Sequence, residues 1–483
     1  MNVTLLSLEI AVVVVGLGLL LAGLWIPGKT KRRLGYVGAI AIGLVFLASY
    51  SRLVDGDSAV TAFNGMYVQD GLALFFKRLF LLTAVLVLLM SVEFADRIAA
   101  GISEFYALLL FALAGMMLAA SANDLILVFV ALELITVTFY VLNSFQRNRV
   151  QSLEAGVKYL ILGALSSAFL VYGIALVFGT ANTTSFTELA ARGQALTAKP
   201  VFLLGFLLVL VGLGFKIAAF PFQIWAPDVY QGSPVPATAF LAVGSKAAGF
   251  VLLLRVLFVA VPAVVPHWEK LLMLVAAITI LYGNLCAIPQ RNLKRLMGYS
   301  SIANAGYLLL GVVAMQPAGS SAMLFFLAGY LFTVVAAFTV ICLVARNTDT
   351  EDISILAGLN QRSPLLATTM TLAMVSLAGL PPLAGFFGKF LLFKAVAERA
   401  AVAPGHYWLL AVAIVGVVIS LYYYFGVVRA IYWSREPADL SPIEISSPIR
   451  ASLSVCVVGM LYLGLFPNSL VNLATTAVSA LKI

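Results

Sequence analysis

Long runs of apolar residues, separated by short polar connections, recur along the whole chain. Each run has roughly 20 residues or more, enough for a helix to cross the ~30 Å hydrocarbon core of a bilayer. Backbone inside a bilayer must satisfy its own hydrogen bonds, which restricts spanning structures to helices and closed barrels. The runs are too long and too uniformly apolar for the alternating strands of about 10 residues in a barrel. The pattern therefore predicts an all-α integral membrane protein.

The limits of the runs predict about fourteen transmembrane helices. These spans lie at residues 3–26, 34–54, 71–92, 103–120, 124–143, 154–178, 201–223, 233–260, 268–288, 294–314, 321–346, 364–396, 408–433 and 450–475. The connections are short, the longest lies near 179–200, and we expect no soluble domain at either end. The first span has no short apolar core followed by a small-residue cleavage site, so we expect it to remain in the mature protein.

Composition supports the membrane assignment. Of the 483 residues, 63% are hydrophobic and only 10% are charged, whereas about a quarter are charged in soluble domains. A net charge of +9 would also suit a nucleic-acid-binding protein, but the basic residues lie in short loops, where membrane topology explains them and no nucleic-acid partner is expected. With two histidines and three scattered cysteines, we expect neither a haem nor a metal site.

Basic residues are shared unequally between the two sides of the membrane. Loops after odd-numbered spans hold fifteen of them: Lys29, Lys31, Arg32, Arg33, Arg97, Arg147, Arg149, Arg291, Lys294, Arg295, Arg346, Arg362, Arg429, Arg435 and Arg450. The opposite side holds six: Arg52, Arg192, Lys199, Lys270, Arg399 and Lys482. Because cytoplasmic loops are enriched in Lys and Arg, we predict that both termini lie on the non-cytoplasmic side of the cell inner membrane.

The remaining eight of the 29 basic residues fall inside predicted spans. They are Lys77, Arg78, Lys158, Lys216, Lys246, Arg255, Lys389 and Lys394. Lys77 and Arg78 are about two turns into their span, and Arg255 and Lys394 are near the ends of theirs. We expect these four side chains to extend their charged ends toward the headgroups.

Glu133, Lys216, Lys246 and Lys389 are too deep in their spans for that explanation. A charge at mid-helix costs roughly 2.5–3.5 kcal/mol even on the most lenient scale, so such residues have partners or line a wet interior. A purely structural ion pair would account for only one lysine, because one carboxylate cannot neutralise three ammonium groups. Removal from water disfavours the charged form of each group, and a nearby opposite charge favours it. A row of such groups joined by water can therefore pass protons.

Lys158 follows Glu154 by four residues at the start of the sixth span, so the two side chains share one helix face in the favoured order. This pair is either an accessory part of the proton pathway or an ion pair at the membrane interface.

Prolines interrupt two of the lysine-bearing spans. Pro221 follows Lys216 by five residues, and Pro381 and Pro382 precede Lys389 by eight and seven. A proline inside a helix removes a hydrogen bond and breaks or kinks the helix. Matched broken helices in a transporter mark inverted repeats around a polar site. We therefore predict broken helices at spans 7 and 12 and four parts: an N-terminal segment (1–102), two inverted five-helix repeats (103–260 and 261–433) and a C-terminal helix (434–483).

Three stretches around these residues resemble one known family. They are GFKIAAFPFQIWAPDVYQGSPVPATAFLAVGSKAAGF (Gly214–Phe250), RNLKRLMGYSSIANAGYLLLG (Arg291–Gly311) and LAGLPPLAGFFGKF (Leu377–Phe390). They resemble the antiporter-like membrane subunits of respiratory complex I, and the resemblance covers almost the whole chain. Within that superfamily, APDVYQGSP (Ala226–Pro234) is most similar to the subunit N class. Lys389 also favours the resemblance to the subunit N class, because the subunit M class is expected to have a glutamate at this position.

The resemblance implies a role for each of the four buried charges. Glu133 would pair with Lys216, Lys246 would be the central lysine of a proton relay, and Lys389 would lie on its exit side. The complex would couple NADH oxidation and quinone reduction to proton movement. Flavin, iron–sulfur clusters and quinone would be held by other subunits, and none by this chain. Its partners would be a neighbouring antiporter-like subunit, small membrane subunits, the lipid bilayer and protons.

Two positions depart from the family pattern. Many relatives have histidine where this chain has Gln223 and Asn304. Glutamine and asparagine can orient water but do not titrate near neutral pH. We interpret both as structural hydrogen-bonding residues.

Three alternatives to a complex I subunit remain open. A subunit of a multisubunit sodium/proton antiporter is disfavoured, because sodium needs several oxygen ligands and only one carboxylate is predicted at mid-membrane. A subunit of a membrane-bound hydrogenase complex is poorly excluded by the chain alone. A structural scaffold is disfavoured by the cost of four buried charges.

Overall fold

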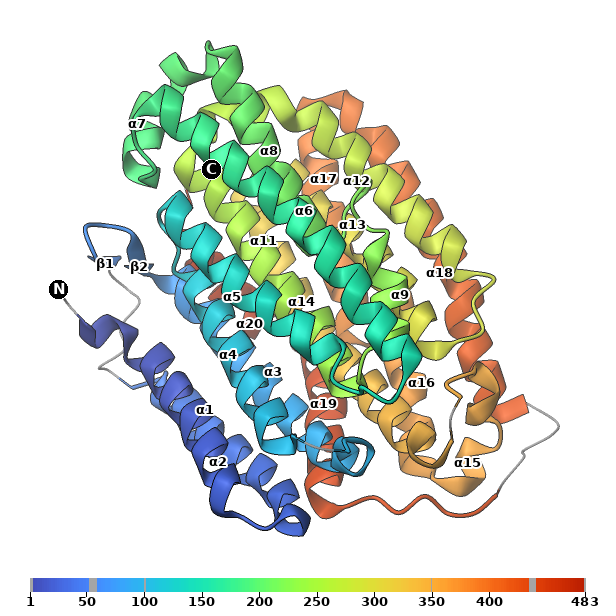
Figure 1. Ribbon diagram of the computed structural model, residues 1–483. Coiled ribbons are helices and arrows are strands. Elements are labelled where there is room, and N and C mark those ends of the chain that lie inside the picture. The colour runs from blue at the N-terminus through green and yellow to red at the C-terminus, as the bar shows by residue number, and fades with distance from the viewer. Residues whose placement is uncertain (1–2, 52–58, 100, 349, 434–439, 482–483) are drawn as a thin grey trace.

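Helices make up nearly all of the computed structural model, which describes residues 3–51, 59–99, 101–348, 350–433 and 440–481 (Figure 1). The helices are α1 Ser7–Trp25, α2 Leu34–Ala48, α3 Gly71–Phe94, α4 Ile102–Ala120, α5 Leu125–Asn143, α6 Val150–Ala181, α7 Phe186–Thr197, α8 Pro200–Ile217, α9 Trp225–Gly232, α10 Val235–Phe240, α11 Lys246–Arg255, α12 Val265–Ala287, α13 Leu293–Val313, α14 Pro317–Val344, α15 Leu359–Arg362, α16 Pro364–Ala378, α17 Ala384–Val402, α18 Tyr407–Trp433, α19 Ser447–Leu465 and α20 Asn468–Val478. The π-helix η4 (Leu241–Ser245) joins α10 to α11, and a second π-helix, η5 (Val256–Ala260), extends α11 at its C-terminal end. Two short strands, β1 (Val60–Ala62) and β2 (Tyr67–Gln69), pair antiparallel.

The prediction of an all-helical membrane protein is confirmed. In the described ranges, twelve helices are long and apolar enough to cross a bilayer. Two further predicted spans correspond to α2 and α16, which have 15 residues each, so the number fourteen remains a prediction. Large apolar side chains are exposed on the outer helices, among them Leu24, Ile40 and Val418. Contiguous exposed apolar surface of this kind is suited to lipid or to other membrane subunits.

Polar residues at the turns set where several helices begin. The side chains of Asp70, Asp124 and Asn292 accept hydrogen bonds from backbone N–H groups in the first turns of α3, α5 and α13, at 2.8, 2.8 and 3.0 Å. Such caps satisfy donors that a helix start leaves free. The polar residues between apolar runs therefore position the helices that carry Glu133 and the tyrosines and serines described below.

The two broken helices predicted from prolines are present. Helix α8 ends at Ile217, and Ala218 takes the left-handed conformation before the chain restarts in α9. Helix α16 ends at Ala378, Gly379 has a φ of +82°, and the chain restarts in α17. Both breaks contain a cis X–Pro bond, at Phe220–Pro221 and Pro381–Pro382. Span 7 therefore ends about two turns earlier than predicted.

Other local features differ from the prediction. The long connection near 179–200 contains helix α7. The predicted span 450–475 is two helices, α19 and α20, because the chain leaves the helical conformation at Phe466 and restarts after Pro467. The β1–β2 hairpin had no counterpart in the prediction. Arg52, Arg435 and Lys482 of the charge count lie outside the described residues, as does the start of the segment 434–483.

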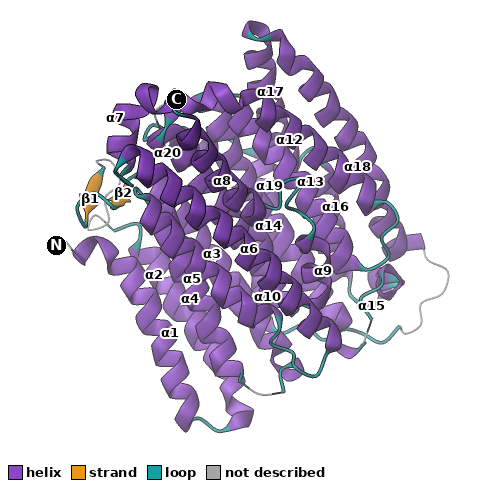
Figure 2. Ribbon diagram, turned by 45° about the horizontal axis from the view of Figure 1, so that its top comes forward, coloured by secondary structure: helices purple, strands orange, loops and turns teal. Residues whose placement is uncertain are grey.

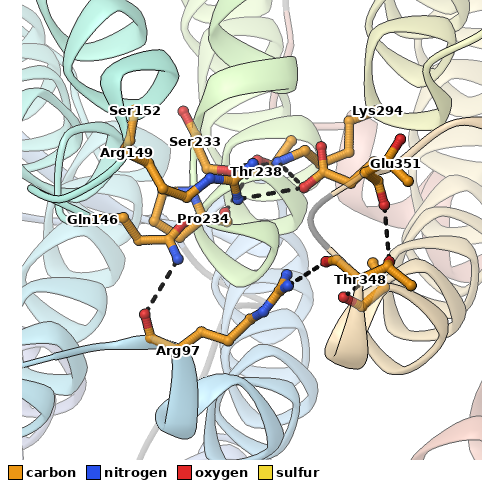
Figure 3. Close-up of polar contacts among 12 residues, drawn as sticks. Arg97, Gln146, Arg149, Ser152, Ser233, Pro234, Thr238, Lys294, Thr348 and Glu351 are labelled. Carbon is orange, nitrogen blue, oxygen red and sulfur yellow. Dashed lines mark hydrogen bonds and ion pairs between the residues drawn. The ribbon is translucent and has the colours of Figure 1, made fainter.

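Connections that are distant in sequence meet at each end of the bundle (Figure 2). At one end, strand β2 bridges to Ala122 in the α4–α5 turn, and Asp124 bridges to Ser185 before α7. At the other end, Asn292 bridges to Asp352 in the loop after α14. Figure 3 shows the side chains that connect the chain segments at this second end.

Candidate functional site

Lys216, a residue of α8, is buried against helices α5 and α6. It lies in the last turn of α8, only 4% exposed. Its Nζ donates to Thr136 Oγ1 at 3.0 Å and to Tyr159 Oη at 3.4 Å. At the break in α8, the carbonyl of Phe215 accepts hydrogen bonds from the backbone N–H of Ala218 and from Trp225 Nε1, both at 3.0 Å. Hydroxyl groups inside apolar spans, which gave no strong signal in the sequence, therefore surround this lysine.

Glu133 lies near Lys216 without pairing to it directly. The carboxylate of Glu133 accepts a hydrogen bond from Ser167 of α6. No ion pair of 4.0 Å or less joins it to Lys216, so the expected direct pairing is not present. Both residues instead line a cavity of about 10 Å³ together with Thr136 and Ser166. A volume of that size is close to what a single water needs. Each charge thus has its own hydroxyl partner on the wall of this cavity, Ser167 for Glu133 and Thr136 for Lys216.

Lys246 is the first residue of α11 and directly follows a π-helical turn, a feature frequent at functional sites. Its side chain is 2% exposed. It donates to the backbone oxygen of Ser301 at 2.6 Å and also to the hydroxyl of that residue. The Ser301 hydroxyl makes a further hydrogen bond of 3.0 Å with Tyr230.

Lys389 binds the end of the broken helix. Its Nζ donates to the carbonyl oxygens of Leu377 at 2.7 Å and Ala378 at 3.5 Å, the last two residues of α16. These carbonyls have no partner within the helix, and the C-terminal end of a helix favours a cation. The ammonium also lies 4.8 Å from the centre of the Tyr307 ring. Pro381 and Pro382 therefore create the acceptor site for this lysine.

Lys158 belongs to a more exposed ion cluster. It is 41% exposed and pairs with Glu154 and Asp228, both at 2.6 Å. Arg295 also pairs with Asp228 and donates to Gln231 at 3.1 Å. The predicted Glu154–Lys158 pair is present, but the sequence analysis missed Asp228 and Arg295. One sequence feature alone pointed to this cluster: the charged residue Asp228 follows the predicted helix break at Pro221.

Gln223 and Asn304 are both buried. Asn304 Nδ2 donates to the backbone oxygen of Ser300 at 2.9 Å. Among the described residues, Gln223 Oε1 and Asn304 Oδ1 have no hydrogen-bond partner. These two acceptors do not decide the role of either residue, so the interpretation of both as structural hydrogen-bonding residues stays a prediction.

Two basic residues expected to reach the headgroups are instead buried in ion pairs. Lys77, fully buried, pairs with Glu9 at 2.9 Å and donates to Tyr67 at 2.6 Å. Arg255, 1% exposed, pairs with Asp70 at 2.7 Å. The prediction was wrong because Glu9 in the first turn of α1 and Asp70 at the N-cap of α3 are themselves buried and pair with these basic residues. Arg78 donates to the backbone oxygen of Ser49, and Lys394 is exposed, as expected of residues near the interface.

Figure 3 shows a second group of buried charges at the opposite end of the bundle. Lys294, fully buried, lies 3.1 Å from the Glu351 carboxylate and donates to the backbone oxygen of Ser233 at 2.7 Å. Arg149 lies 3.6 Å from the same carboxylate. Arg97 donates to the backbone oxygen of Thr348 at 2.5 Å. This group joins the loop before α6 to α13 and to the loop after α14.

Known proteins similar to this chain were found by sequence. A family model described as "NADH:quinone oxidoreductase/Mrp antiporter, TM" matches residues 122–420. NADH-quinone oxidoreductase subunit N of Desulforamulus reducens is 39% identical over 476 residues, covering 99% of this chain and 98% of that protein. The protein of the same name from Heliobacterium modesticaldum is 40% identical over 483 residues and all of both chains. F(420)H(2) dehydrogenase subunit N of Methanosarcina mazei is 36% identical over 98% of each.

Solved structures give the same result. A chain of respiratory complex I from Thermus thermophilus with bound aureothin matches with a TM-score of 0.80 and 36% identity, covering 97% of this chain and 99% of that one. A chain of the Mrp complex from Dietzia sp. matches with a TM-score of 0.85 at 22% identity, covering 100% of this chain and 98% of that one. The second match shows a shared fold alone.

Proposed function

Because the chain belongs to the family of NADH-quinone oxidoreductase subunit N, and is thus a membrane subunit of a multisubunit complex, we propose that it translocates protons through Glu133, Lys216, Lys246 and Lys389. The relay has no redox step of its own. Quinone reduction elsewhere in the complex drives it, and flavin, iron–sulfur clusters and quinone belong to other subunits. The electron donor is NADH, as the names of the bacterial relatives suggest.

One observation carries this proposal. Lys216, Lys246 and Lys389 are each at most 4% exposed, and among the described residues none lies within 4.0 Å of a carboxylate oxygen. Their partners are hydroxyl and carbonyl oxygens. A permanent, unpaired ammonium is very costly in such surroundings. A lysine that releases and regains a proton removes that cost in one of its two states. Structural ion pairs in the same molecule, such as Lys77 with Glu9, do have carboxylates.

The proposal includes the orientation and the internal repeats. Both termini lie on the non-cytoplasmic side of the cell inner membrane, and residues 103–260 and 261–433 form two inverted repeats. The broken helices α8 and α16 occupy equivalent positions in these repeats, and each lies beside one relay lysine. Lys158 with Glu154 serves the relay as an accessory ion pair at its exposed edge.

Replacement of relay residues in the assembled complex tests the proposed function. We expect Lys216→Ala and Glu133→Ala each to lower proton pumping and the coupled quinone reductase rate by about 10-fold or more, since a positioned proton carrier contributes at least that much. Pumping is measured as acidification in proteoliposomes, and assembly by native gel. Lys394→Ala is the matched control, because Lys394 is 60% exposed. Wild-type pumping by both relay variants overturns the proposed function.

A further inference from the structure

A row of buried hydroxyl groups lies in the region between Lys246 and Lys389, on helices that contribute none of the four relay residues. Helix α13 supplies Ser300, Ser301 and Tyr307, and helix α18 supplies Tyr423 and Tyr424. All five side chains except Tyr423 are at most 2% exposed, and Tyr423 is 3% exposed. We call these five residues the hydroxyl row.

The first part of the hydroxyl row contacts Lys246. The ammonium of Lys246 donates to both oxygens of Ser301. The next residue, Ser300, is hydrogen-bonded to Tyr424 with 2.5 Å between the two hydroxyl oxygens. The rings of Tyr424 and Tyr423 are adjacent, with their centres 4.3 Å apart. Hydrogen bonds thus join Lys246 to Ser301 of α13 and Ser300 of α13 to Tyr424 of α18, and the remaining steps are between adjacent residues of one helix.

The second part of the hydroxyl row leads to Lys389. Tyr423 Oη donates to Asn284 Oδ1 at 2.9 Å, and Asn284 Nδ2 donates to Tyr307 Oη at 3.3 Å. The Lys389 ammonium lies over the Tyr307 ring. Each tyrosine and serine therefore has a polar neighbour on the path between the two lysines.

Glycine in α18 leaves space for this second part. A Cβ atom at Gly416 would lie 2.8 Å from Tyr307 Oη and 3.0 Å from Asn284 Nδ2. Both distances are too short for these atoms to stay where they are. The absence of a side chain on this face of α18 therefore keeps the Tyr307–Asn284 contact intact.

A purely structural explanation treats these hydroxyls as satisfied core residues. It accounts for single contacts, because buried polar groups are normally hydrogen-bonded. It does not account for five hydroxyls and one amide that together extend from one unpaired lysine to the next. The sequence has no histidine within either helix of the row, so a titratable imidazole does not connect the two lysines there.

We propose that the hydroxyl row carries the proton between Lys246 and Lys389, an inference that rests on the proposed function. An N–H bond of the Lys246 ammonium breaks, and its proton goes to Ser301 Oγ, which releases its own hydrogen. Each later hydroxyl accepts one proton and releases another, so none changes its net charge. The last proton forms an N–H bond on the neutral Lys389 amine. Water bridges each junction at which no hydrogen bond joins two hydroxyls: between the two serines, between Tyr424 and Tyr423, between Tyr423 and Tyr307 beside Asn284, and between Tyr307 and Lys389.

Asn284 is a positioning residue in this pathway. An amide does not exchange protons readily, but its two ends bind Tyr423 and Tyr307 at once. It therefore fixes the two hydroxyls on either side of a bridging water. The reverse transfer, from Lys389 to Lys246, uses the same contacts.

Tyr424→Phe in the whole complex, reconstituted in liposomes, tests the inference. It removes one oxygen and keeps the ring, so we expect the complex to assemble while protons pumped per quinone reduced fall by about 10-fold or more. Tyr106→Phe is the matched control: Tyr106 is equally buried in α4 and donates to the Arg32 backbone oxygen at 3.2 Å. We expect it to pump like the wild type.

Ser300→Ala is a second test of the inference. It decides the outcome if the complex with Tyr424→Phe does not assemble. We expect it to lower pumping and to enlarge the rate difference between H₂O and D₂O, because a slower proton transfer then limits the rate. A structural defect alone leaves that ratio unchanged. If Lys216→Ala and Glu133→Ala lose pumping but Tyr424→Phe and Ser300→Ala pump like the wild type, the hydroxyl row is overturned and the proposed function stands. If all four variants pump normally, both are overturned.

Discussion

This protein contains two kinds of buried basic residue. Lys77 and Arg255 each contact a carboxylate, from Glu9 and Asp70. Among the described residues, the hydrogen-bond partners of Lys216, Lys246 and Lys389 are all neutral oxygens. A paired cation keeps its charge and serves packing, whereas an unpaired one in a dry site is stable only if the charge is temporary. The nature of the partner therefore separates structural lysines from the proposed relay lysines.

Gly379 is expected to be essential for the position of Lys389. Its φ of +82° is unfavourable for other residues, and a Cβ there would lie 2.9 Å from Lys389 Cδ. We expect Gly379→Ala to displace the ammonium from the α16 carbonyls and to reduce pumping several-fold, with reconstituted complex as the assay. Gly426→Ala is the control, because no atom lies within 4 Å of a Cβ at that position. Equal pumping by the two variants would contradict this explanation.

The burial of Lys216, Lys246 and Lys389 could be predicted from their positions deep in apolar runs, although Glu133 is only partly buried. The partners of all four residues could not be predicted. Depth follows from counting residues into an apolar run. Partners depend on which helices pack together, and so the contacts of Lys246 with Ser301 and of Lys389 with Leu377 were not foreseeable. The expected Glu133–Lys216 pair illustrates the limit: both residues line one cavity, but serine and threonine hydroxyls lie around them instead of a direct contact.

At the scale of helices, prolines located the breaks but not the helix ends. The α8 break was predicted at Pro221, whereas the helix already ends at Ile217 because Ala218 is left-handed. In span 12, a carbonyl oxygen at the end of α16 accepts a hydrogen bond from Lys389, so the helix break is part of the surroundings of this lysine. The division of span 14 into α19 and α20 was missed, although Pro467 lies within the predicted run.

The Lys77–Glu9 ion pair links α3 to α1, which packs against α4 and α2. Tyr67, from strand β2, completes the contact by bonding to both residues. We expect Glu9→Ala to leave a buried ammonium unpaired and to destabilise the packing of α1 by about 3 kcal/mol. Thermal denaturation of the isolated complex measures this loss.

The control for this effect is Glu188→Ala in α7. Glu188 pairs with Arg192 at 3.8 Å, and both side chains are more than half exposed. Exposed pairs of this kind contribute little, so we expect a change within about 0.5 kcal/mol. An equal loss of stability in both variants would show that burial of the Lys77–Glu9 pair is unimportant.

At the scale of the whole molecule, the group around Glu351 joins parts that are distant in the chain (Figure 3). Lys294 and Arg149 both approach its carboxylate, from α13 and from the loop before α6. We expect Glu351→Gln to weaken this connection by about 3 kcal/mol, because the fully buried Lys294 then has no carboxylate. The weakened connection is measured as faster proteolysis of the loop 345–353. Glu398→Gln, at an exposed pair, should leave proteolysis unchanged.

The lack of carboxylates beside the relay lysines has an electrical consequence. A lysine that moves or titrates together with a paired carboxylate carries no net charge across the bilayer, so the membrane potential does little work on it. Within the described ranges, Lys216, Lys246 and Lys389 have no carboxylate at ion-pair distance. In the proposed relay, a proton that passes along them is therefore an uncompensated charge, on which 100 mV across the whole membrane acts with about 2.3 kcal/mol. The occupancy of the three lysines should accordingly shift with the voltage that the complex itself generates.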